Sequence, residues 1–158
     1  VIDYLFSSGI QNTIIDKVVL VSPLIRSSGW HLTKLSYMML HPFIKSIPRV
    51  LRRDSTNKTF IEFRKHDPLE FNRITIDWAG AMINWNKRIE TFPVSQKQVL
   101  IIQGTKNLTV AWKYNIRFLK QKLPAAKIEY IRGIDHHMLN ESEPVRYKIF
   151  KTINDYLD

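Results

Sequence analysis

The sequence contains no cysteine, which excludes disulfides, thiolate metal sites and cysteine nucleophiles together. No apolar run approaches the ~20 residues of a membrane-spanning helix, and no basic region followed by an apolar stretch opens the chain as in a signal peptide. We therefore expect a protein of a reducing compartment such as the cytoplasm. Because the chain begins with Val1 and not with methionine, we expect a processed or truncated start.

Acidic residues are in the minority, with 14 Asp and Glu against 24 Lys and Arg, and the formal net charge is +10. A basic domain can bind nucleic acid, but the basic residues are spread along the chain, with one local cluster at Arg49, Arg52 and Arg53. Neither zinc-finger spacing nor an RNP-like strand accompanies them. We expect no nucleic-acid partner, which would bind with strong salt dependence. A solvated basic face, or peripheral contact with an anionic membrane surface, fits better.

What the sequence does contain is typical of one globular α/β domain. The chain has 158 residues, of which 44% are hydrophobic, enough to bury a core. Continuous apolar runs without polar alternation predict strands buried on both faces, as in a parallel sheet. Residues 16–23 form such a run, and residues 98–103 and 126–133 are predicted as the second and third strands. The predicted helices are residues 1–6, with a stop at 7–9, residues 109–124 and residues 140–156.

Residues 24–93 mix aromatic, apolar and basic side chains at helical spacing. Helices are indicated over residues 30–39 and 74–89, and the segment 66–72 resembles a helix start with Asp67 as N-cap and Pro68 in the first turn. We interpret this region as several short helices that lie over the rest of the domain. They form either a plain helical layer or a lid over an apolar site, to which the Met and Trp content would be suited.

Two polar loops follow the second and third predicted strands. The first reads GTKN at residues 104–107, and the second reads GIDHHMLNE at residues 133–141. Loops at the carboxyl ends of parallel strands are where open α/β sheets place their chemistry. These motifs and their spacing resemble the C-terminal part of an α/β-hydrolase. They are similar to the lysophospholipase and monoacylglycerol-lipase group, also called serine aminopeptidase S33 or hydrolase_4, and the resemblance extends over the whole chain.

The resemblance implies a partial α/β-hydrolase domain, with about three parallel strands flanked by helices and an inserted helical cap. Residues 1–23 would supply a helix end and a core strand, residues 24–93 the cap, and residues 94–158 the last strands, the two loops and the last helix. His136, three residues after Gly133, would be the catalytic base, and Asn107 would occupy the position of the catalytic acid, which is Asp in the family. His137 would have a supporting role or none.

No cofactor is implied. Zinc needs three or four ligands at workable spacing, and the remaining histidines, His31, His41 and His66, supply no such pattern. We therefore expect no metal site at the paired histidines. The alternative is that His136 and His137 are loop residues without a chemical role.

Two departures from the family pattern limit what this chain can do. The G-x-S-x-G nucleophile motif does not occur, because Ser7-Ser8-Gly9 and Ser27-Ser28-Gly29 lack the preceding glycine. In addition, Asn107 brings no charge, and Asp135 is badly placed to turn back onto the ring of its neighbour His136. We expect a fragment or degenerate form whose N-terminal half is missing. The implied chemistry is hydrolysis of carboxylic lipid monoesters, and the alternative is a non-catalytic module that binds a ligand or partner.

Overall fold

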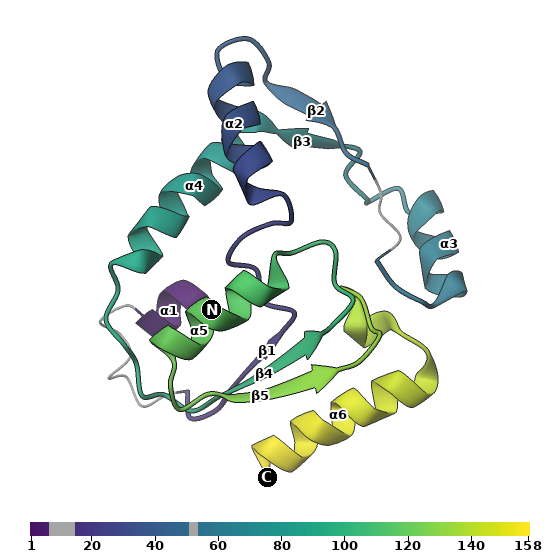
Figure 1. Cartoon of the computed structure of the whole chain (residues 1–158). Coiled ribbons are helices and arrows are strands. Elements are labelled where there is room, and N and C mark those ends of the chain that lie inside the picture. The colour runs from purple at the N-terminus through teal and green to yellow at the C-terminus, as the bar shows by residue number, and fades with distance from the viewer. Residues whose placement is uncertain (7–14, 51–53) are drawn as a thin grey trace.

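The computed structural model describes residues 1–6, 15–50 and 54–158. Its centre is a three-stranded parallel sheet in the order β1-β4-β5 (Figure 1), formed by Val18–Val21, Val99–Gly104 and Lys127–Ile131. Val18 pairs with Val99, and Leu100 pairs with Lys127. The three strands lie within a few residues of the predicted ones, and the predicted parallel α/β sheet is confirmed.

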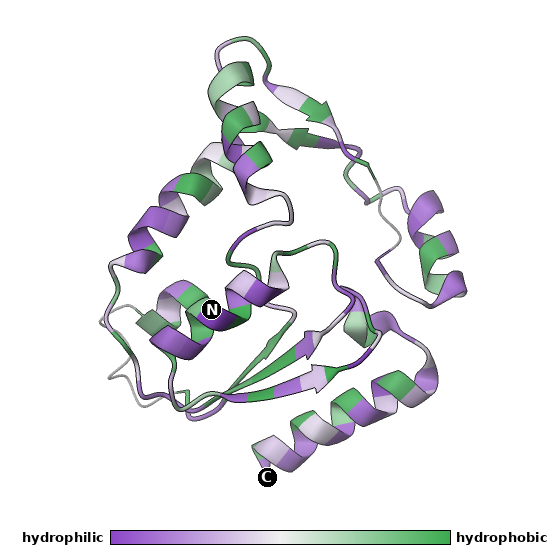
Figure 2. Cartoon of the chain, in the orientation of Figure 1, coloured by the Kyte–Doolittle hydropathy of each residue, from purple (hydrophilic) through white to green (hydrophobic). Residues whose placement is uncertain are grey.

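Helices cover both faces of this sheet, which explains why its middle strand begins with four apolar residues, Val99 to Ile102. Every residue of β4 is buried. On one face, α1 (Ile2–Phe6) and α5 (Trp112–Lys122) pack against a cluster that includes Leu20 and Ile101. On the other face, α6 (Glu143–Leu157) packs against Leu100 and Ile102. Figure 2 shows the hydrophobic colouring along β1 and β4, between these helical layers.

Between residues 24 and 93, the residues that the structure describes form three helices and, in addition, a two-stranded antiparallel ribbon that we did not predict. Its elements are α2 (Trp30–Leu40), β2 (Ser46–Pro48), α3 (Lys58–His66), β3 (Arg73–Thr75) and α4 (Ile76–Glu90). Ile47 and Ile74 are partners in the ribbon. A strand of three residues is too short to show a recognisable alternation of polar and apolar side chains. In the sequence, the residues of both strands therefore resemble parts of the neighbouring helices.

The helix start expected at residues 66–72 is wrong. Helix α3 ends at His66, and the following residues form a turn in which the Glu70 amide donates to the Asp67 carbonyl at 3.1 Å. The Asp67 side chain accepts from the Leu69 amide at 2.9 Å. Asp can bind the backbone two residues on in a turn as readily as it caps a helix, so the DPL sequence alone does not distinguish the two.

The last helix begins at Glu143, three residues later than expected. Its N-cap is Ser142 and Pro144 lies in its first turn, while a short 3-10 helix, η2 (Met138–Asn140), precedes it. Glu141 is therefore outside the helix, and its side chain is free to bind elsewhere. The expected stop at residues 7–9 and the arginines at 52 and 53 lie outside the described residues. No helix in the described part of the chain is long and apolar enough to cross a membrane.

Candidate active site

The loops that follow β4 and β5 are joined into one unit at the carboxyl ends of the strands. The Thr105 amide donates to the Ile131 carbonyl at 3.1 Å, and the Lys106 amide donates to the Ile134 carbonyl at 3.0 Å. A Cβ on Gly104 would lie 2.4 Å from the Ile134 carbonyl oxygen. Only glycine allows so close an approach, so Gly104 is required for the second loop to reach the first.

Asn107 and His136, the two predicted site residues, are brought together by these loops. The Nδ2 atom of Asn107 lies 3.1 Å from Nδ1 of His136. The Oδ1 atom of Asn107 accepts from the amides of Thr109 and Val110 at 3.0 and 3.2 Å. Because two N–H donors face Oδ1, the amide cannot be reversed without placing its NH₂ group against them. The NH₂ group therefore donates to the ring of His136.

This orientation selects one tautomer of His136. A neutral imidazole has one N–H donor and one acceptor nitrogen. Since Nδ1 accepts from the Asn107 amide, the ring proton is on Nε2. A carboxylate in place of the amide would select the opposite tautomer, because it can only accept a proton from Nδ1. The nitrogen that His136 presents away from Asn107 is thus a hydrogen-bond donor in the neutral ring.

The surroundings of His136 favour its neutral form. Burial and the neighbouring His137 lower the pKa of His136 below the usual histidine value, and the carboxylates of Asp54 and Asp135 oppose this only in part. The His136 and His137 rings meet edge to face with centroids 5.3 Å apart. Near neutral pH, we therefore expect a neutral His136 ring with its proton on Nε2, the tautomer that the hydrogen bond from Asn107 selects.

Asp135 is buried, but its carboxylate faces the backbone. Its Oδ1 atom accepts from the amide of His136 at 2.9 Å and from that of Leu108 at 3.3 Å. Through the bond to Leu108, Asp135 therefore connects the loop after β5 to the loop after β4. The carboxylate of Asp135 thus binds backbone amides and does not turn back onto the ring of His136, as expected.

His137 makes contacts that its sequence neighbours do not reveal. Its Nε2 atom lies 3.3 Å from Oδ2 of Asp54, and Arg64 donates to the other oxygen of Asp54 at 2.6 Å. Burial raises the pKa of Asp54, but the hydrogen bonds and charges of His137 and Arg64 outweigh it, so this pKa is below its usual value. Asp54 lies more than 80 residues before His137, and no local motif in the sequence marked it.

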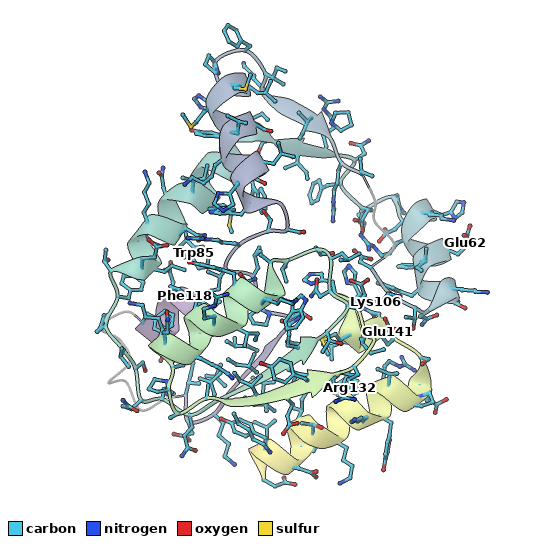
Figure 3. All side chains as sticks on the ribbon, viewed as in Figure 1. Glu62, Trp85, Lys106, Phe118, Arg132 and Glu141 are labelled. Carbon is cyan, nitrogen blue, oxygen red and sulfur yellow. The ribbon has the colours of Figure 1, made fainter. Side chains whose placement is uncertain are left out.

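Other polar groups also gather near these loops. Figure 3 shows Lys106 and Glu141 close to the ends of β4 and β5.

Among the residues that the structure describes, no group of three or more His, Asp or Glu side chains is arranged to hold a metal ion. The exposed His66 lies next to Glu62, and His41 lies 3.4 Å from Asp77.

Comparison with known proteins gives the same fold. No family model matches the sequence. The chain is 29% identical over 96 residues to a probable lysophospholipase L2 of Haemophilus influenzae, an alignment that covers 60% of this chain and 30% of that protein.

Two solved structures superpose on nearly the whole chain. The monoacylglycerol lipase of Paleococcus ferrophilus has a TM-score of 0.78 at 19% identity and is matched over 99% of this chain and 62% of that one. A soluble variant of the monoglyceride lipase of Saccharomyces cerevisiae, in complex with a substrate analogue, has a TM-score of 0.79 at 17% identity, over 99% and 60%. The chain thus has an α/β-hydrolase fold and spans about 60% of the length of these lipases. The predicted resemblance is confirmed.

Proposed function

We propose that this chain is the C-terminal part of an α/β-hydrolase that cleaves single-chain lipid esters, with His136 as the base and Asn107 at the position of the acid. The observation that carries the proposal is the 3.1 Å contact between Asn107 and His136 at the ends of neighbouring parallel strands. The substrate class is supported by the lysophospholipase and monoglyceride lipases to which the chain is similar.

The chemistry is transfer of an acyl group from an alcohol to water. A serine oxygen attacks the ester carbonyl, the serine proton passes to Nε2 of histidine, and the histidine returns it to the departing alcohol. Water then repeats the sequence to release the carboxylic acid. In this proposal the serine comes from sequence before Val1, since G-x-S-x-G does not occur in the chain. Within the described sheet, β1 pairs with β4 alone, so its other edge can accept a further strand.

Asn107 makes this a poor catalytic histidine. With the ring proton on Nε2, the ring cannot accept a proton from serine until it changes tautomer and gives up the bond from Asn107. In an unrelated serine protease, replacing the acid by asparagine lowers kcat about 10⁴-fold. The amide orientation therefore favours a second candidate, a non-catalytic module that holds a ligand. In such a module, the Nε2–H group would donate a hydrogen bond to an oxygen of the ligand.

The gene sequence before Val1 and an esterase assay separate the two candidates. An in-frame strand ending in G-x-S-x-G supports the hydrolase, and a start codon directly before Val1 supports the binding module. On the full gene product, we expect slow hydrolysis of p-nitrophenyl butyrate that His136→Ala removes. The matched control is His31→Ala, which changes an exposed histidine of α2. Equal turnover by the wild type and His136→Ala would remove His136 from the mechanism.

We also propose peripheral contact between the cap and an anionic membrane surface, with the protein itself in the cytoplasm. Large apolar side chains project from α2 and the turn after it: Met38 is 73% exposed and Phe43 is 85% exposed. Lys34 and Lys45 flank them in the sequence. Apolar side chains beside lysines are suited to the interface of an anionic bilayer.

Sedimentation with lipid vesicles tests this contact. We expect binding to phosphatidylglycerol vesicles that weakens with salt, and weaker binding to phosphatidylcholine vesicles. The double substitution Met38→Ser and Phe43→Ser should reduce it, whereas Tyr147→Ser with Phe150→Ser, on the exposed face of α6, should not. Equal losses in both double variants would mean that the cap is not the docking face.

A further inference from the structure

The segment before α3 holds the loop that carries His136. The amide of His137 donates to the carbonyl of Asp54 at 3.0 Å. Three residues further on, Asn57 donates from Nδ2 to the carbonyl of Asn140 at 2.9 Å. These contacts fasten both ends of the stretch from His137 to Asn140. We refer to Asp54, Thr56 and Asn57 as the clamp.

Thr56 completes the clamp by binding the buried side chain of Glu141. The Thr56 amide donates to Oε1 of Glu141 at 2.8 Å, and the Thr56 hydroxyl donates to Oε2. Glu141 has no solvent-exposed surface. A buried carboxylate is tolerated only when its oxygens are hydrogen-bonded, so Thr56 and Glu141 hold each other in place. Their contact explains why Glu141 lies outside α6.

The Asp54 carboxylate is itself held rigidly. Arg64 binds it at 2.6 Å and binds Glu70 at 2.7 Å, and the Arg64 and Asp54 side chains are each 9% exposed. The ring of His137 packs against Phe60 of α3 with centroids 5.3 Å apart. In Figure 1, α3 accordingly lies beside the loop after β5, across the β2–β3 ribbon from α2 and α4. This part of the cap is attached to the loop of His136.

We propose that Asp54 is a positioning residue for His136, which it acts on through His137. Asp54 fixes His137 at both its amide and its ring, while Asn107 binds the ring of the next residue, His136, from the opposite loop. With residue 137 immobilised, the His136 ring keeps Nδ1 against Asn107. Displacement of α3, by a ligand or a partner, would therefore be transmitted to the ring of His136.

The inference rests on His136 being the functional residue of the proposed site, but it is tested on the ring itself and not on turnover. In Asp54→Asn, the negative charge beside the His137 ring is lost, while the main-chain bond to the His137 amide remains. We expect NMR of the ¹⁵N-labelled chain to show a lower pKa of His136, because Asp54 opposes the effect of burial. We also expect the Nε2–H tautomer, dominant in the wild type, to become a mixture of the two.

The matched control is Glu70→Gln, which removes the other carboxylate of Arg64 and leaves the contact between Asp54 and His137. It should leave the His136 tautomer unchanged. If Asp54→Asn does not fold, His137→Asn replaces it, because it removes the ring that Asp54 contacts and keeps the main-chain amide that donates to the Asp54 carbonyl. An unchanged His136 tautomer in the folded variant, or an equal change in Glu70→Gln, overturns the proposal. An inactive gene product with an intact clamp would instead contradict the proposed function alone.

Discussion

We expect the substitution Asn107→Asp to reverse the ring tautomer of His136. The carboxylate of Asp has the same shape as the amide, so one oxygen can keep the amides of Thr109 and Val110, now at 3.0 and 3.2 Å. The other oxygen replaces Nδ2, which lies 3.1 Å from Nδ1 of His136. It can only accept, and the ring must then carry a proton on Nδ1.

The size of the effect follows from this one contact. A hydrogen bond to a charged partner contributes about 1.5–3 kcal/mol, and each 1.36 kcal/mol corresponds to about one pKa unit. The charged ring gains this bond more than the neutral one does. We therefore expect the titration midpoint of His136 to rise by about one to two pH units relative to the wild type.

The assay is a pH titration of the ¹⁵N-labelled protein by NMR, which reports both the midpoint and the tautomer of each histidine. The control is Asn140→Asp, which makes the same chemical change at an exposed position four residues from His136. It should shift the midpoint less and leave the tautomer unchanged. A wild-type His136 with its neutral proton on Nδ1 would refute the amide orientation, and with it the reason for calling this a poor base.

Three further outcomes concern stability, each measured by urea denaturation. Because burial lowers the pKa of folded His136, the unfolded chain takes up the proton at higher pH, so the free energy of unfolding should fall as the pH drops below about 6.5; His136→Gln should weaken this dependence. Gly104→Ala places a methyl 2.4 Å from the Ile134 carbonyl and should cost about 1–3 kcal/mol or more, so unchanged stability would contradict the close approach. Asn115→Ala removes the hydrogen bonds to the amide of Arg26 and the carbonyl of Pro23, while the carbonyl of Arg26 keeps the amide of Ala111, and should cost roughly 2–4 kcal/mol.

The sheet and the place of the site could be predicted because local patterns determine both. The apolar runs of β1 and β4 have no polar alternation, which only a sheet covered on both faces accommodates. The polar loops with Asn107 and His136 directly follow β4 and β5, and parallel neighbours bring their carboxyl ends to one edge. The β2–β3 ribbon and the turn at Asp67 could not be predicted in this way, because such short elements have too few residues to show the hydrophobic periodicity of a strand or helix.

By itself the sequence determined the fold, the identity of the two residues that meet, and the absence of a nucleophile motif. The tertiary structure alone decided the direction of the Asn107 amide, since that depends on the turn of its own backbone toward Thr109 and Val110. It also decided that Asp54 holds His137. Each of these side chains has several possible hydrogen-bond partners, and only the folded chain selects among them.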